Sequence, residues 1–230
     1  SDDSELEKAT VEMLTRQMTS HDLPWIVALD RPGLRVFCHG IRKASSHVYP
    51  LSDGTGVVLG TLFRRRGDCS SARLTLSAKD TRDIQTSAGF NLVEQYWGRY
   101  VAFLQSAESH TIRVLKSPSG ELDCQTTCIG SVRVFFSRAD QCPLLRSRSF
   151  SPNWNYLAAD LAVGMLPETR ETGMHELERV LRGECWSIRQ GRVERRQYWH
   201  PYRFVTSERI DEPDIAASEL RYTTHECVRA

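Results

Sequence analysis

The strongest constraint on the fold is an apolar run in the middle of the chain, YWGRYVAFL at residues 96–104. In an extended strand, alternate side chains point to opposite sides. One side carries Tyr100, Ala102 and Leu104, and the other carries Val101 and Phe103. Because both sides are apolar, the run predicts a central strand of a sheet that is covered on both faces. Trp97 followed by Gly98 begins the run, and a glycine there indicates a close approach of another backbone.

Short strand-like runs surround this one, and few helical patterns separate them. We expect further strands at residues 25–29, 34–39, 57–63, 111–115, 123–128, 131–137, 184–189 and 193–199. We expect helices at 4–18, 84–96, 153–162 and 215–228, and a short helix or turn at 175–181. We expect a loop at 49–54, and a loop that can include a short helix at 69–83. The strands from 111 to 137 read as a β-meander, and no βαβ unit repeats. The pattern therefore predicts an antiparallel α+β fold.

Charge and hydropathy exclude several classes of partner. Lys and Arg number 30 against 29 Asp and Glu, so the net charge of +1 exerts no general attraction on nucleic acid or an anionic membrane. No apolar run approaches the roughly 20 residues that span a bilayer. The acidic start of the chain, residues 1–7, lacks the apolar core of a signal peptide. We expect a soluble, cytoplasmic protein that binds neither nucleic acid nor membrane.

The cysteines and histidines give no clear reactive centre. Seven cysteines are an odd number, which favours free thiols in a reducing compartment. Cys124 and Cys128 lack a second pair of ligands, so no metal site is expected. Cys38 and Cys69 are the candidate nucleophiles, and the arginines at 64–66 would lower the pKa of the Cys69 thiol if they lay close to it. The alternative is a bystander thiol in a polar loop, and the arginines are either a solvated rim or an anion site.

Several segments, taken in chain order, resemble the glutamine amidotransferase domain of asparagine synthetases. YWGRYVAFL is similar to the DGMFAFA segment of that family, and VVLGTLF at 57–63 is similar to its NGEIYN strand. The remaining matches are LKSPSG at 115–120 with the RDPxG turn, VFFSR at 134–138 with FASE, NYLA at 155–158, LRGE at 181–184 with the LxPG turn, and YW at 198–199. The resemblance covers about residues 24–202.

The resemblance implies an α+β Ntn-hydrolase-like αββα sandwich, in which two antiparallel sheets stack between helical layers. It also implies three parts of the chain. They are an N-terminal amphipathic extension at 1–22, a glutaminase-like domain at 23–205, and a linker with the first helix of an ATP-dependent synthetase domain at 206–230. The rest of that synthetase domain, with its SGGxDS loop, is absent from the sequence.

Departures from the family pattern remove the glutaminase chemistry. Such an enzyme begins with a cysteine whose own α-amino group is the base, whereas this chain begins with Ser1. Leu59 and Thr61 replace the Asn and Glu of NGE around Gly60, and Trp97 replaces the Asp before Gly98. Loss of one oxyanion donor alone costs about a hundred- to thousandfold in rate. We therefore expect a degenerate glutamine site at these five positions and no catalytic residue in the chain.

Two groups of family members keep this fold without the glutaminase, the lasso-peptide macrolactam cyclases and the β-lactam synthetases. YWGRYVAFL and the CVRA ending resemble the cyclases most. The implied enzyme adenylates a side-chain carboxylate of a precursor peptide with ATP and Mg²⁺ for attack by the N-terminal amine of that peptide. Its partners would be its own synthetase domain, the precursor peptide, and leader-binding and leader-peptidase proteins.

Three alternatives stay open at this point. One is a β-lactam synthetase-like ligase. Another is a true glutamine-dependent amidotransferase with a cryptic nucleophile, for which Cys38 or Cys69 is the candidate. The third is a freestanding interaction module without chemistry.

Overall fold

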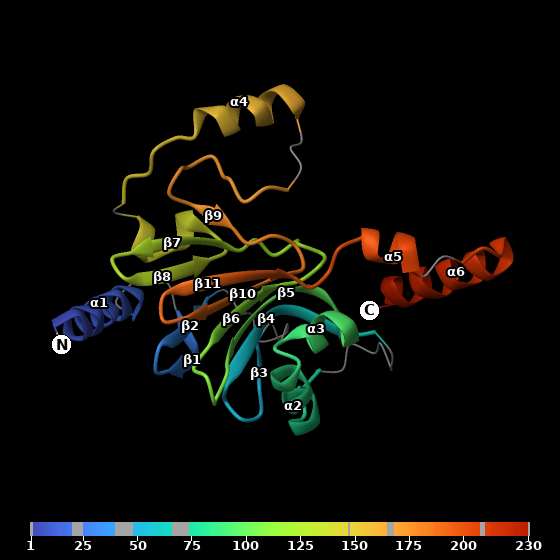
Figure 1. The fold of residues 1–230 in the computed structure, drawn as a ribbon, viewed down its shortest axis with the longest axis horizontal. Coiled ribbons are helices and arrows are strands. Elements are labelled where there is room, and N and C mark those ends of the chain that lie inside the picture. The colour runs from blue at the N-terminus through green and yellow to red at the C-terminus, as the bar shows by residue number, and fades with distance from the viewer. Residues whose placement is uncertain are drawn as a thin grey trace. The chain divides into compact units, whose positions relative to one another are not determined.

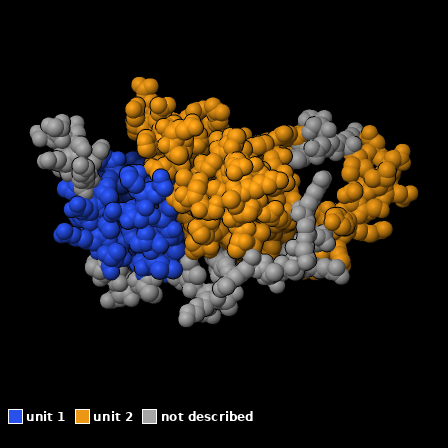
Figure 2. Space-filling view, turned by 90° about the horizontal axis from the view of Figure 1, so that it is seen from below, with its two compact units in different colours: residues 1–42, 121–181 blue, residues 43–120, 182–230 orange. Residues whose placement is uncertain are grey.

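The computed structural model describes residues 2–19, 25–39, 48–65, 74–146, 148–164, 168–207 and 210–229. The chain forms two compact units, each made from two separate stretches of sequence (Figure 2). Unit 1 comprises Ser1–Arg42 and Glu121–Leu181, and unit 2 comprises Lys43–Gly120 and Arg182–Ala230. Every paired strand in both units is antiparallel. The predicted α+β class with antiparallel sheets is therefore confirmed.

Unit 2 is built on a six-stranded sheet (Figure 1). In spatial order its strands are β11 (Arg192–Gln197), β10 (Glu184–Arg189), β6 (Ile112–Lys116), β5 (Tyr96–Gln105), β4 (Gly56–Arg64) and β3 (Val48–Pro50). The strand expected at the centre pairs with β4 on one side and β6 on the other. Tyr100 and Ala102 on one face and Val101 on the other are all buried. The predicted central strand with two covered faces is confirmed.

Two short helices of unit 2, α2 (Ala78–Thr86) and α3 (Phe90–Gln95), cover one face of this sheet. Their buried residues Ile84 and Leu92 join one core cluster with Val58, Tyr100 and Leu104 of the strands. The Tyr100 hydroxyl donates a hydrogen bond to the Leu92 carbonyl (2.9 Å), which fixes α3 on β5. This cluster places both helices on the side of the sheet from which Tyr100 projects.

The single helix predicted at 84–96 is wrong, because the chain breaks between α2 and α3. Ala88 and Gly89 have φ angles of 56° and 93°. A right-handed helix cannot continue through two residues with left-handed backbone. The helix also starts earlier than predicted, at the capping box formed by Ser77 and Asp80. The capping box satisfies backbone N–H groups at the start of the helix. It explains why α2 begins in the polar stretch 69–83, where a loop with at most a short helix was expected.

Unit 1 contains a hairpin and a small sheet. The hairpin joins β1 (Ile26–Arg31) and β2 (Leu34–Cys38), as the sequence predicts. The sheet is ordered β8 (Val132–Phe136), β7 (Gln125–Ile129) and β9 (Glu178–Arg179). The helical elements are α1 (Asp2–Thr19), η1 (Ala139–Gln141), η2 (Pro143–Leu145) and α4 (Trp154–Val163). Leu14 of the predicted N-terminal helix enters a core with Phe136, Leu145 and Leu177.

The predicted β-meander is wrong at its first step. β7 and β8 pair as expected, but β6 belongs to the sheet of unit 2. The turn at 117–120 is held by β5, because the Ser117 amide donates to the Tyr100 carbonyl (2.9 Å) and the Ser119 hydroxyl donates to the Gly98 carbonyl (2.7 Å). Beyond this anchored turn the chain leaves the sheet, so consecutive strands enter different sheets.

Two short segments contain strands that the sequence did not predict. Val48–Pro50 forms the edge strand β3 rather than a loop, and an edge position accommodates a proline that has no N–H to donate. The segment expected as a short helix or turn at 175–181 is a turn followed by β9. The C-terminal helices are α5 (Tyr202–Ser207) and α6 (Pro213–Arg229), and α6 matches the helix predicted at 215–228.

Candidate functional site

The five positions that the resemblance assigns to a degenerate glutamine site lie together on β4 and β5 of unit 2. Leu59-Gly60-Thr61 of β4 lies opposite residues 99–101 of β5, and Trp97-Gly98 lies opposite Leu62-Phe63, the next two residues of β4. Both glycines have positive φ angles, 116° at Gly60 and 124° at Gly98. The structure thus brings together residues that are far apart in the sequence.

Each glycine makes room for a carbonyl group of the opposite strand. A Cβ atom at Gly60 would overlap the carbonyl oxygen of Arg99, and one at Gly98 would overlap the carbonyl oxygen of Thr61. Any side chain at either position would force β4 and β5 apart, in addition to the strain of a positive φ. The close backbone approach predicted at Gly98 is therefore confirmed, and Gly60 adds a second one.

Trp97 packs on an aromatic neighbour at this point of the sheet. Its ring stacks on Phe63, directly opposite on β4, with ring centroids 4.5 Å apart and an interplanar angle of 25°. The indole is half-buried. It offers an apolar surface at the position where the resemblance expects a carboxylate that holds an ammonium group. Leu59 is likewise apolar and cannot act as an oxyanion donor.

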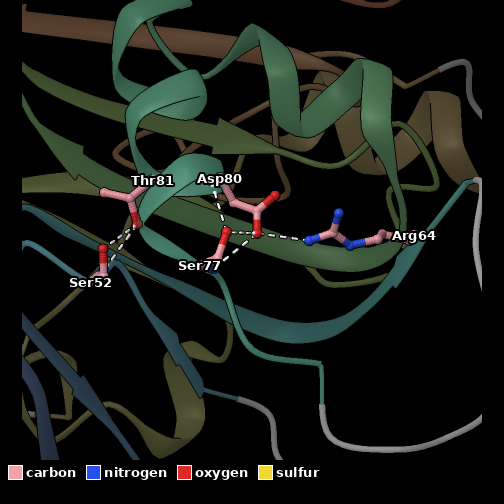
Figure 3. Close-up of polar contacts among 5 residues, drawn as sticks. All are labelled: Ser52, Arg64, Ser77, Asp80 and Thr81. Carbon is pink, nitrogen blue, oxygen red and sulfur yellow. Dashed lines mark hydrogen bonds and ion pairs between the residues drawn. The ribbon is translucent and has the colours of Figure 1, made fainter.

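A polar cluster lies at the C-terminal end of β4, next to the start of α2 (Figure 3). One oxygen of the Asp80 carboxylate accepts from the Arg64 guanidinium (2.7 Å), the Ser77 hydroxyl (2.6 Å) and the Ser77 amide (2.9 Å). Burial alone would raise the pKa of Asp80, but these hydrogen bonds and the Arg64 charge outweigh it, so the pKa lies below its usual value. The Ser52 amide and hydroxyl both donate to the neighbouring Thr81 hydroxyl (3.0 Å each).

This cluster joins the start of α2 to β4 and to the loop after β3. The Arg64 guanidinium also lies over the Tyr96 ring, 5.4 Å from its centroid. Of the arginines at 64–66, Arg64 is therefore an ion-pair partner of Asp80 rather than a free anion site, and Arg66 lies outside the described residues. Each interaction of the cluster is between groups of the protein itself, which indicates a structural role.

Cys38, the candidate nucleophile that the structure describes, gains no activation from its surroundings. Burial raises the pKa of the Cys38 thiol, which lowers its thiolate fraction. Burial also raises the pKa of Cys142, and it raises that of Cys185 to about 11. Cys69 lies outside the described residues. No group of three or more potential metal ligands lies together in the part of the chain that the structure describes.

Sequence reasoning missed a cavity of about 620 Å³ in unit 2. Four arginines and one glutamate line it, and they come from β6, β10 and β11. The signal in the sequence was the basic run RQGRVERRQ at 189–197. By itself this run predicts only a solvated hairpin, because the pairing of β10 with β6 cannot be deduced from it.

Comparison with known proteins gives no relative, because neither a protein-family model nor a curated protein matches the chain. Within the described ranges, no helix combines the length and the apolar character needed to cross a bilayer.

Proposed function

We propose that this chain is the glutaminase-inactive N-terminal domain of an asparagine-synthetase-like, ATP-dependent amide ligase, and that the ligase is a lasso-peptide cyclase. Two glycines on neighbouring strands, Gly60 of β4 and Gly98 of β5, carry the proposal. The family motifs place a glycine in NGE and another in the DG pair, and Gly60 and Gly98 stand at those two positions with positive φ angles. The backbone requirement of the site is kept, while Leu59, Thr61 and Trp97 replace the groups that would bind and activate glutamine.

The finer fold assignment, an Ntn-type αββα sandwich, is part of the same proposal. Unit 2 supports it with a large antiparallel sheet that carries helices on one face. The opposite face is also buried, because Val57, Val114 and Trp186 are all 0% exposed. Such a sheet is what a layer inside a sandwich requires.

The division into an extension at 1–22, a glutaminase-like domain at 23–205 and a synthetase start at 206–230 belongs to the proposal as well. Helix α6 supports its last part. Ile215, Leu220, Tyr222 and Val228 are all more than half exposed on this helix. Large apolar side chains on one exposed helix are suited to packing against a further domain. In the ligase, that domain would bind ATP and Mg²⁺ and carry out the adenylation.

The proposed setting is the cytoplasm. The cysteines that the structure describes are free thiols, which suits a reducing compartment. The proposed partners are the synthetase domain, the precursor peptide, and leader-binding and leader-peptidase proteins. No residue of this chain is assigned a catalytic role.

The test is to incubate the parent ligase with its precursor peptide, ATP and Mg²⁺, without glutamine or ammonia, and to measure the peptide mass. A cyclase forms an amide within the peptide, so the peptide loses one water while ATP yields AMP. The control peptide carries an amide in place of the reacting side-chain carboxylate, and its mass stays unchanged. An unchanged mass of the native peptide overturns the cyclase assignment. A product that forms only with glutamine identifies a true amidotransferase instead.

An interaction module without chemistry is the second candidate, and helix α4 favours it. Trp154, Leu161 and Val163 on this helix are 72%, 86% and 65% exposed. Exposed apolar side chains of this size are typical of a protein-binding surface. Reading the gene past the codon for Ala230 separates the candidates, because an SGGxDS loop downstream excludes a module that acts alone.

A further inference from the structure

The basic cavity of unit 2 has a floor made by three neighbouring strands. Ser187 of β10 is paired with Arg113 of β6 on one side and with Glu194 of β11 on the other. Arg189 is paired with Arg192 two residues further along the hairpin. Residues two apart on a strand project from the same face. These side chains therefore form two adjacent rows on one face of the sheet, and all of them line the cavity.

The charges on this floor do not balance. Arg196 donates to the Glu194 carboxylate (2.8 Å), which uses the one acidic side chain of the cavity. Arg113, Arg189 and Arg192 have no carboxylate partner among the residues that the structure describes. The chain as a whole has a net charge of only +1. Three uncompensated guanidinium groups around one cavity are thus a local feature and not a consequence of a basic protein.

The wall of the cavity is fixed before any ligand binds. The Tyr198 hydroxyl donates to the carbonyl of Ala88 (3.1 Å), in the left-handed link between α2 and α3. The Tyr198 ring also meets the Phe90 ring edge-on, with centroids 5.5 Å apart. The hydroxyl groups of Ser187 and Thr111 add hydrogen-bonding groups to the lining. A preformed wall lowers the entropy cost of binding.

Protection of a sheet edge does not account for all of these arginines. β11 is an edge strand, and charged residues on an edge strand prevent pairing with other chains. Arg113, however, lies on β6, which has a hydrogen-bonded strand on each side. Its side chain is half-buried, where a charge is costly unless a counter-ion is present.

We propose that this cavity binds a small phosphorylated ligand, with Arg113, Arg189 and Arg192 holding its phosphate. A guanidinium matches the oxygens of a phosphate in a bidentate manner, and each pair adds a charge-assisted hydrogen bond. The volume of about 620 Å³ lies in the usual range for small-molecule sites. It leaves room for a second phosphate or an organic group beyond the first phosphate. The proposal stands on this cavity alone and does not depend on the ligase assignment.

The test is isothermal titration of the 230-residue chain with inorganic pyrophosphate and, separately, with ribose 5-phosphate at low salt. Saturable binding of either probe supports the site, and the tighter of the two tells whether the ligand is an inorganic polyphosphate or a phosphorylated organic molecule. Arg113→Gln is expected to weaken binding about ten- to a hundredfold, the usual effect of losing a charged hydrogen bond. The control Arg82→Gln removes an exposed arginine from α2 and is expected to leave binding unchanged.

A second variant separates a loss of binding from a loss of folding. Arg189→Gln with Arg192→Gln changes two exposed side chains beside the hairpin turn, and an unchanged circular dichroism melt checks the fold. This variant is also expected to weaken binding at least tenfold. Three results overturn the proposal: neither probe binds, the arginine variants bind as tightly as Arg82→Gln, or citrate binds as tightly as the phosphorylated probes.

Discussion

Replacing Gly98 by alanine tests the close approach of β4 and β5 that the candidate site depends on. The new Cβ would overlap the Thr61 carbonyl oxygen and touch the Phe63 ring at 3.4 Å. Backbone strain at a φ of 124° costs about 1–3 kcal/mol, and overpacking costs about 1–3 kcal/mol more. The expected loss in the free energy of unfolding is therefore about 2–6 kcal/mol, a large part of the about 5–15 kcal/mol that stabilises a domain.

Gly54→Ala is the matched control in the same unit. Gly54 also has a positive φ, 68°, but a Cβ there meets nothing within 4 Å. Its expected cost is only the left-handed strain of about 1–2 kcal/mol. The two variants thus share the backbone effect and differ in the steric overlap.

The assay is amide hydrogen exchange of peptides from β4 and β5, read by mass spectrometry, because a chain with two compact units need not unfold in one step. Where the exchange rate follows the equilibrium between closed and open states, Gly98→Ala is expected to speed exchange about thirtyfold or more, at a factor of ten for each 1.4 kcal/mol. Gly60→Ala should behave in the same way, because its Cβ would overlap the Arg99 carbonyl oxygen. Equal exchange rates in Gly98→Ala and Gly54→Ala would refute the close approach.

Two further predictions concern ionisable groups. The pKa of Asp80 is lower in the folded chain than in the unfolded chain. Its ionised form therefore stabilises the fold fully at pH values above the ordinary carboxyl pKa of about 3.9. This stabilisation is lost as the pH falls through the pKa that Asp80 has in the folded chain. Thermal melts should show that Asp80→Asn is less stable than the unchanged chain at pH 7, and that this difference in stability shrinks at acidic pH. A difference in stability that does not depend on pH contradicts the ion pair. Burial raises the pKa of Cys185 to about 11, so iodoacetamide at pH 8 should modify the exposed Cys128 and Cys227 in the folded chain and reach Cys185 only after unfolding. Modification of Cys185 as fast as Cys128, measured by peptide mass spectrometry, contradicts its burial.

Local signals in the sequence were enough to predict most elements of the fold. The apolar faces of residues 96–104 predicted a central strand, and the turn composition after residue 29 predicted the first hairpin. The start of α2 was missed although Ser77 and Asp80 have capping-box spacing. The apolar periodicity of that stretch is too weak to indicate a helix. The break between α2 and α3 was missed because Gly89 was accepted as a glycine inside a helix, and because Ala88 gives no sign of a left-handed backbone.

Pairings between distant segments could not be predicted in this way. Strand β6 and strand β7 follow each other in the chain and enter different sheets, a choice set by contacts of the turn at 117–120 with β5. The basic cavity was missed for the same reason, since Arg113 and Arg189 are far apart in the sequence and only strand register brings them together. The close approach at Gly98 was predicted from its place at the start of the apolar run, whereas its neighbour, the Thr61 carbonyl of β4, is known only from the strand register.

The most direct test of the central claim, a retained amidotransferase fold without glutaminase chemistry, is a glutaminase assay on the chain itself. Glutamine is incubated with the chain over a range of pH, and glutamate is measured against a protein-free blank. The proposal has Trp97 and Leu59 in place of the groups that would bind glutamine and stabilise the oxyanion, so it predicts that glutamate stays at the level of the blank. Release of glutamate that disappears in Cys38→Ala or Cys69→Ala would contradict the claim and identify an active amidotransferase.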